Sequence, residues 1–191
     1  TLLLADFVTA QAYHAAGGKS FYDYNSGGAR EPKVSFDRPG LPQLGAMGAI
    51  IRWMLAQGLS FEVASLVDLH THPRLLHDYD CIVFGDHAEY WSAPMRLQVE
   101  RFVSNGGNVM CLSGNTCYRQ VRFEDDARTL VSFKNAKDDP EPDAALCTVA
   151  FAQPPVHRPP NAMLGVGWTY GGFDGAPGTT PTPYKVHFPT H

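Results

Sequence analysis

Four short apolar runs alternate with three more polar segments in the first 115 residues. The runs are "TLLLADFV" at 1–8, "SFEVASLV" at 60–67, "DCIVFGD" at 80–86 and "NVMCLSGN" at 108–115. Short apolar runs bounded by turn residues are typical of buried strands. With a helix in each gap, the order is β-α-β-α-β-α-β. This order predicts an α/β fold whose doubly wound, mostly parallel sheet carries helices on both faces.

The three intervening segments have the features of helices. "LGAMGAIIRWMLAQG" places apolar residues at helical spacing and ends at Gly58, a plausible position for a helix stop. "SAPMRLQVERFVSNGG" opens with Ser92 and Pro94, which favour a helix start, and closes on two glycines. "DLHTHPRLLHDY" predicts a short, irregular helix.

The pattern becomes less regular after residue 116. "TLVSFKN", "ALCTVAF" and "YKVHF" are candidate strands, separated by stretches rich in Asp, Pro, Gly and Thr. We therefore expect an irregular, β-rich C-terminal part within a single domain spanning 1–191. The chain opens without Met inside an apolar run and stops just after another, so we expect it to be a piece of a longer polypeptide.

Composition excludes several classes of protein. The net charge is −4, and Lys and Arg are scattered rather than gathered in a basic stripe, which argues against a nucleic-acid partner. The apolar stretch "AMGAIIRWMLAQGL" is interrupted by Arg52 and Gln57 and is too short to cross a bilayer. The four cysteines show no Cys-x-x-Cys spacing, so we expect free thiols in a reducing, cytoplasmic compartment.

Polar side chains follow three of the expected strands. Tyr13 comes after the first, Asp86, His87 and Glu89 come after the third, and the segment 113–116 comes after the fourth. Open parallel sheets bind ligands beyond the carboxyl ends of their strands. The three sets are therefore expected to meet at one edge of the sheet.

The stretch "GDHAEYWSAP" at 85–94 carries the candidate chemistry. Residues two apart in an extended chain project to the same side, so His87 and Glu89 are expected to face one cavity. A carboxylate is a hard metal ligand, and a histidine beside it can move protons near neutral pH. Two plainer interpretations stay open. Glu89 is favoured electrostatically near a helix N-terminus, and a lone histidine is often a hydrogen-bonded structural residue.

Other candidate sites are weaker. His70 and His72 form a His-x-His pair, but no third ligand lies at a zinc-like spacing. "GGKS" at 17–20 lacks the spacing of a phosphate-binding loop. No turn is expected to expose a cysteine as a nucleophile. The long segment from Gly17 to about Gly45 is rich in aromatics, including Tyr22 and Tyr24, and we expect an ordered excursion that covers a site.

Four stretches of the sequence resemble the large-subunit family of N,N-dimethylformamidase. They are "AYHAAGGKSFYDYNS", "REPKVSFDRP", "DHAEYWS" and "SNGGNVMCLSGNTCYR", and they occur in the family's order. The resemblance covers residues 1–120 well and the remainder loosely. It implies a class I glutamine-amidotransferase-like α/β domain that hydrolyses the C–N bond of a small amide. It also implies a small partner subunit and a homo-oligomer.

The resemblance further implies a mononuclear iron centre, Fe(III), held by two tyrosinates and one glutamate. Carried over by position, Tyr13 and Glu89 are metal ligands, His87 handles protons and Asn115 orients the substrate. The metal would polarise the amide carbonyl or activate water. The second tyrosinate and a further catalytic carboxylate are placed outside this chain. The chain departs from the family pattern at His14, where Asn is usual, and at Ala88, where an acidic residue is usual. The substrate is therefore expected to differ from dimethylformamide.

A non-catalytic function remains the alternative. A domain of the same fold that has lost its metal would bind a metabolite or carbohydrate, or would serve in assembly. Iron bound to tyrosinate is coloured, so metal content and visible absorption separate the two hypotheses.

Overall fold

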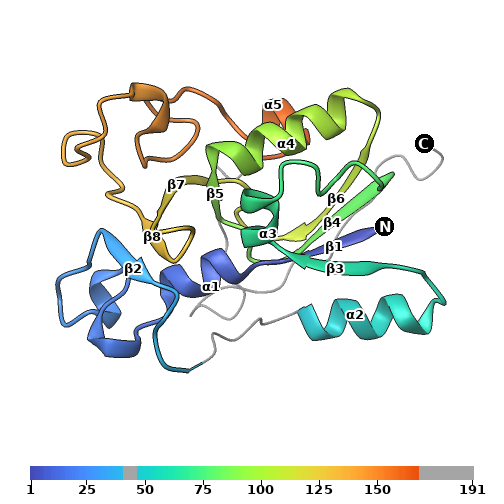
Figure 1. The fold of residues 1–191 in the computed structure, drawn as a ribbon, viewed down its shortest axis with the longest axis horizontal. Helices are drawn as coiled ribbons and strands as arrows, with labels where there is room; N and C mark the ends of the chain where they lie inside the picture. The colour runs from blue at the N-terminus through green and yellow to red at the C-terminus, as the bar shows by residue number, and fades with distance from the viewer. Residues whose placement is uncertain (41–46, 168–191) are drawn as a thin grey trace, which may run out of the picture.

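A four-stranded parallel sheet forms the centre of the molecule (Figure 1). The structure, a computed structural model, describes residues 1–40 and 47–167. The strands are β1 (Leu2–Ala5), β3 (Glu62–Ser65), β4 (Cys81–Asp86) and β6 (Asn108–Ser113), in the spatial order β3-β1-β4-β6. Every neighbouring pair is parallel. These are the four strands that the apolar runs predict.

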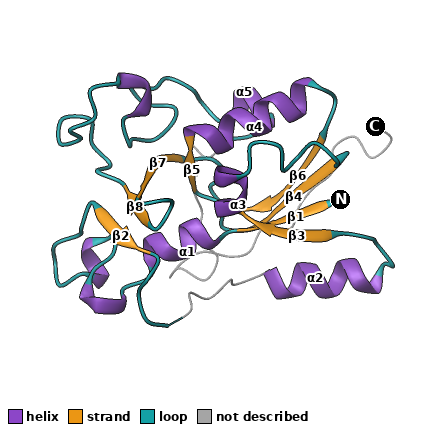
Figure 2. Ribbon diagram, viewed as in Figure 1, coloured by secondary structure: helices purple, strands orange, loops and turns teal. Residues whose placement is uncertain are grey.

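Helices cover both faces of this sheet (Figure 2). They are α1 (Phe7–Tyr13), α2 (Met47–Ala56), α3 (Leu66–Thr71), α4 (Ala93–Ser104) and the short α5 (Asn161–Leu164). Leu3 and Val83 pack with α2 in one apolar cluster, whereas Leu4 and Phe84 belong to a larger cluster that includes α1, α3 and α4. Successive residues of a strand point to opposite faces, so the two clusters form the two sides of the sheet. The doubly wound α/β prediction is confirmed; the narrower amidotransferase-like class stays a prediction.

A second, mixed sheet lies beside the first (Figure 2). Its strands are β2 (Lys33–Ser35), β8 (Thr129–Val131), β7 (Arg119–Glu124) and β5 (Tyr90–Ser92), in that spatial order. β5 and β7 are parallel, and the other pairs are antiparallel. β5 follows β4 after three residues, so this second sheet starts at the carboxyl edge of the first.

The sequence pattern is wrong in several places. The first strand ends at Ala5 rather than at residue 8, because Asp6 caps α1 by accepting a hydrogen bond from the backbone N–H of Thr9. The strands β2, β5 and β7 and the helix α1 were not expected. "ALCTVAF" is not a strand: it begins in a 3-10 turn at Ala144–Leu146 and contributes only an isolated bridge at Ala150. "YKVHF" lies outside the described residues.

The expected helix ends are confirmed. Ser92 caps α4 and accepts a hydrogen bond from Met95 N, with a proline in the first turn. After α4, Gly107 packs so closely against Phe102 that an added Cβ atom would lie 2.4 Å from its ring. Gly58 ends the turn after α2 with a φ of 67°.

Two further sequence predictions concern cysteines and membranes. All four cysteines are free, and Cys117 and Cys147 are buried. Within residues 1–40 and 47–167, no helix has the length and apolar character needed to cross a bilayer. The cytoplasmic location stays a prediction.

A buried carboxylate fastens the irregular segment after β8 to β7. Asp139 accepts two hydrogen bonds from the Arg122 guanidinium, at 2.9 and 2.8 Å, and two more from Thr148. Burial opposes ionisation of Asp139, but these hydrogen bonds outweigh it and lower its pKa to about 2.

We predict that Asp139→Asn lowers the free energy of unfolding at pH 7 by about 2 kcal/mol. The folded pKa lies below the unfolded value, so the stabilisation is complete above pH 4 and is lost as the pH falls through the folded pKa of about 2. Urea unfolding between pH 7 and pH 2 measures the difference. Asp126→Asn, at an exposed turn, is the control. A difference in unfolding free energy between wild type and Asp139→Asn that stays constant down to pH 2 would contradict a lowered pKa for Asp139.

Candidate functional site

The candidate site begins where β4 ends. Asp86 has a left-handed φ of 62°, which turns the chain out of the strand. Glu89 N then donates to the carbonyl oxygen of His87 at 3.0 Å, and Ala88 N donates to Ser113 Oγ at 2.7 Å. The segment is therefore a tight turn fastened to the end of β6, not the extended chain that the sequence predicts.

Tyr13, His87 and Glu89 lie together at this edge. Tyr13 is the last residue of α1, and its hydroxyl donates to Glu89 Oε2 at 2.9 Å. His87 Nε2 lies 3.5 Å from the same oxygen. The rings of Tyr13 and His87 are tilted against each other, with their centroids 5.6 Å apart. Two residues that the sequence singles out, Tyr13 and His87, thus contact one carboxylate oxygen of a third, Glu89.

Asn115 lies at the same edge but is not in that cluster. It follows β6 with a φ of 50°, one residue after Gly114, whose backbone lies close to the His87 ring. Its carbonyl accepts a hydrogen bond from Tyr118 N. Its side chain makes no hydrogen bond within the part of the chain that the structure describes. Asn115, the residue expected to orient the substrate, therefore lies near His87. Its side-chain amide has no hydrogen-bond partner among the described residues.

A second tyrosine reaches the same carboxylate. The Tyr22 hydroxyl lies 3.4 Å from Glu89 Oε2 and 2.8 Å from the hydroxyl of Tyr90. The Tyr22 ring stacks on Tyr13, with centroids 4.1 Å apart. Lys134 Nζ lies 3.5 Å from the centroid of Tyr22. Tyr22 comes from the aromatic excursion, so that segment does cover the site, as expected. The sequence did not identify Tyr22 as a group at the centre of the site.

The other oxygen of the carboxylate faces an arginine. Arg119 Nε lies 3.4 Å from Glu89 Oε1, and the Arg119 backbone N–H donates to the Glu89 carbonyl at 2.9 Å. Glu89 is only 3 % exposed, so this ion pair compensates a buried charge. Arg119 Nε is itself buried and has no hydrogen-bond acceptor among the described residues. The arginine therefore pairs with Glu89 by charge without fixing it by a hydrogen bond.

Burial controls the protonation of the tyrosines. It raises the pKa of the Tyr13 and Tyr22 hydroxyls above the ordinary range, and the neighbouring Glu89 carboxylate raises both further. Both groups are therefore neutral phenols near pH 7 without a bound metal ion. Burial, and then repulsion from Arg119, lowers the pKa of the Lys134 ammonium to about 7. A strong positive charge beside Glu89 Oε2 would favour the phenolate form of both tyrosines.

A buried hydroxyl fixes the Glu89 backbone from behind. Thr9 Oγ1 accepts hydrogen bonds from Glu89 N at 3.0 Å and from Tyr90 N at 3.1 Å. Thr9 in turn is held by Asp6, whose burial raises its pKa to about 8. Asp6 Oδ2 is buried without a hydrogen-bond partner in the described residues. α1 therefore supplies both the Tyr13 hydroxyl and the anchor of Glu89.

A metal ion at this site would depend on tyrosine oxygens. No group of three or more His, Cys, Asp and Glu side chains suited to a metal is found in residues 1–40 and 47–167. His70 and His72 do not form a zinc site: the His70 ring contacts Ser92 Oγ at 2.8 Å and stacks on Phe123, whereas His72 is exposed. The phenol oxygens of Tyr13 and Tyr22 and one oxygen of Glu89 are the donors that converge.

Sequence reasoning missed Arg119, Lys134 and Thr9. Arg119 begins β7 and Lys134 follows β8, in the region where the hydrophobic pattern is weakest. Thr9 lies in α1, a helix that the sequence pattern did not predict. Arg119 does close the quoted motif "SNGGNVMCLSGNTCYR", and this was the one available signal for it.

The comparisons with known proteins agree with the resemblance that the sequence motifs carry. The sequence profile of one family, described as N,N-dimethylformamidase beta subunit-like, C-terminal, matches residues 1–191, the whole of the chain. A search among curated proteins finds no match. The predicted family is thus confirmed over the C-terminal part of the chain as well, where the motifs are weak. The chain belongs to the N,N-dimethylformamidase beta subunit-like C-terminal family.

Proposed function

We propose that this chain provides an iron-binding centre that hydrolyses the C–N bond of a small linear amide. Family membership suggests amide hydrolysis in general. The observation that carries the proposal is the convergence of two phenol oxygens on one buried carboxylate oxygen, at 2.9 Å for Tyr13 and 3.4 Å for Tyr22. Hydrogen-bond contacts of this length place the three oxygens close enough to share one cation.

The donor set fits a hard, oxidised cation. Phenolate and carboxylate oxygens are hard anionic ligands, so they favour Fe(III) over soft metals. Tyr13 and Glu89 would hold the ion, and Tyr22 offers a third oxygen from within this chain. The family resemblance places the second tyrosinate outside the chain, so Tyr22 is an additional candidate. When bound, such an ion polarises an amide carbonyl and lowers the pKa of water.

Each neighbouring residue has a role in this proposal. His87, 3.5 Å from Glu89 Oε2, is suited to take a proton from water and return it to the departing amine. Asn115, with its amide uncommitted, would donate a hydrogen bond to the carbonyl oxygen as negative charge develops there. The stacked rings of Tyr13 and Tyr22 limit the access of water. The positive charge of Arg119, 3.4 Å from Glu89 Oε1, compensates the buried carboxylate.

Two positions support a substrate other than dimethylformamide. Ala88 is fully buried beside His87, so the acidic residue usual in the family would add a charge directly behind the site. The His14 ring contacts the carbonyl of Pro39 at 3.0 Å, so its side chain is engaged by the covering segment. Both differences are next to a proposed ligand in the sequence, whereas Tyr13 and Glu89 themselves are kept. A small partner subunit, a homo-oligomer and a further catalytic carboxylate from outside the chain remain parts of the proposal.

The alternative is a metal-free binding or assembly domain, and one observation favours it. Glu89 already has Arg119 as an ion-pair partner, so the centre is charge-balanced without a cation. Iron content distinguishes the two functions. Colourless, iron-free protein purified from iron-replete cells would reject the iron-dependent hydrolase and favour the binding domain.

We predict that Tyr13→Phe and Glu89→Gln each lower bound iron at least about 10-fold in the complete protein, because each removes an oxygen donor. Elemental analysis, the visible absorption of iron–tyrosinate and hydrolysis of formamide, acetamide and dimethylformamide are the measurements. Tyr79→Phe is the matched control, since its hydroxyl contacts Glu62 on the surface. Tyr13→Phe keeps the ring and therefore tests the hydroxyl with little effect on packing. If iron content and turnover are unchanged in both variants, the proposal is wrong.

We predict that Thr9→Val weakens iron binding about 10- to 100-fold, whereas Thr9→Ser stays near wild type. Valine matches threonine in size but cannot accept the hydrogen bonds of Glu89 N and Tyr90 N, so the carboxylate loses its fixed position. Iron dissociation and the position of the visible band report this positioning, and thermal unfolding reports stability. A Thr9→Val protein that is less stable but binds iron like wild type would confine Thr9 to a structural role.

A further inference from the structure

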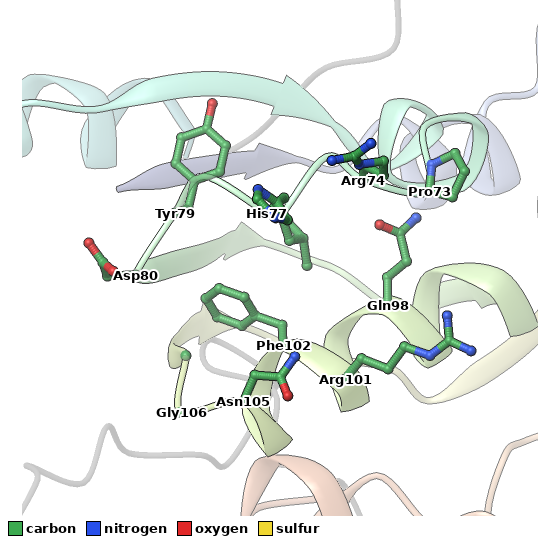
Figure 3. Close-up of a pocket in the computed structure, with 12 residues that line it drawn as sticks. Pro73, Arg74, His77, Tyr79, Asp80, Gln98, Arg101, Phe102, Asn105 and Gly106 are labelled. Carbon is green, nitrogen blue, oxygen red and sulfur yellow. The ribbon is translucent and has the colours of Figure 1, made fainter.

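A cavity of about 470 Å³ lies at the other end of the parallel sheet (Figure 3). One wall is the segment 73–80 between α3 and β4, and the other is the C-terminal half of α4 with the turn that follows it. The cavity borders the amino ends of β4 and β6, whereas Glu89 lies beyond the carboxyl end of β4. A six-residue strand separates the two places, about 20 Å at the usual rise per residue. The cavity is therefore not part of the candidate metal centre.

Two uncommitted arginines line this cavity. Arg74 approaches from the loop and Arg101 from α4, on opposite sides of the cavity (Figure 3). Both residues are exposed, and neither guanidinium group forms an ion pair or hydrogen bond within residues 1–40 and 47–167. By contrast, Arg96, Arg122 and Arg128 each bind a carboxylate. Asp80 is the one carboxylate among the lining residues, so the lining carries a net positive charge.

The remaining lining supplies a flat apolar surface and neutral polar groups. The Phe102 ring is one of the lining groups, and the backbone of Gly107 lies close to it (Figure 3). Gln98 and Asn105 add amide groups at the same end of α4. The Tyr79 hydroxyl donates to Glu62 at 2.6 Å, which fixes that ring at the rim. Volumes of a few hundred Å³ with one apolar wall and a few polar groups are typical of small-molecule sites.

We propose that this cavity binds a small organic anion with a flat apolar part, its carboxylate or phosphate group bound by the guanidinium of Arg74 or Arg101. A guanidinium matches the planar, paired oxygens of either anion, and the Phe102 ring gives the apolar part a surface to pack against. The site would act as a ligand-binding or regulatory site separate from amide hydrolysis, and it does not rest on the proposed function.

The test is isothermal titration calorimetry on the complete protein with four probes: phenyl phosphate, benzoate, inorganic phosphate and benzylamine. We expect phenyl phosphate or benzoate to bind once per chain, and benzylamine, which has the same ring but a positive charge, to bind at least about 10-fold more weakly. Whichever of the two ring anions binds more tightly identifies the head group. Inorganic phosphate binding as tightly as phenyl phosphate would overturn the role of the apolar wall, because it would show an anion site with no ring recognition.

Arg74→Glu and Arg101→Glu should each weaken binding of the ring anion at least about five-fold. Arg52→Glu, on exposed α2 and also without an ion pair among the described residues, should leave it unchanged. All three residues are exposed, so the variants are expected to fold, and thermal unfolding checks this. Glu89→Gln should not affect binding. Absence of binding by both ring anions, binding insensitive to both arginine variants, or binding lost in Glu89→Gln would each overturn the proposal.

Discussion

The candidate centre depends on the groups that compensate one buried carboxylate, that of Glu89. Glu89 is almost inaccessible to water, and an ionised carboxylate in such a place is costly unless donors and opposite charges surround it. Tyr13 supplies a hydrogen bond at one oxygen and Arg119 supplies a charge at the other. The two come from separate parts of the fold, α1 and β7. The contacts that Glu89 makes with Tyr13 and Arg119 therefore join the parallel sheet to the mixed sheet at the candidate centre.

Because the strands of the large sheet are parallel, its two ends carry different groups of residues. At the carboxyl end, the segments that leave β1, β4 and β6 bring Tyr13, Glu89 and Asn115 to one edge. At the amino end, the loop before β4 and the end of α4 line a cavity with two arginines whose guanidinium groups have no partner within residues 1–40 and 47–167. Because all four strands run in one direction, the two sites are held apart by the length of the strands. A ligand at one end could be bound without obstructing the other.

Besides adding to the hydrophobic core, the mixed sheet supplies side chains that surround Glu89. β5 continues directly from the turn that carries Glu89, and β7 pairs with it and delivers Arg119. Lys134, after β8, lies over the ring of Tyr22 and donates to the carbonyl of Phe21, which fastens the aromatic excursion to this sheet. Tyr22 is thereby held against Tyr13 and Glu89. The excursion is ordered at the centre through contacts that come from far along the chain.

The sequence by itself determined the parallel sheet, its flanking helices and the family, because hydrophobic periodicity and local motifs are written in neighbouring residues. It also predicted that Tyr13, His87 and Glu89 meet at one edge of the sheet, since each follows a strand and the carboxyl ends of parallel strands meet. It did not reveal Tyr22, Arg119 or Thr9 at the centre, nor the pairing of β7 and β5. Those depend on long-range contacts, such as the 80 residues between Thr9 and Glu89. Only the folded chain decides which distant donors satisfy a buried carboxylate, because local propensity carries no information about that partner.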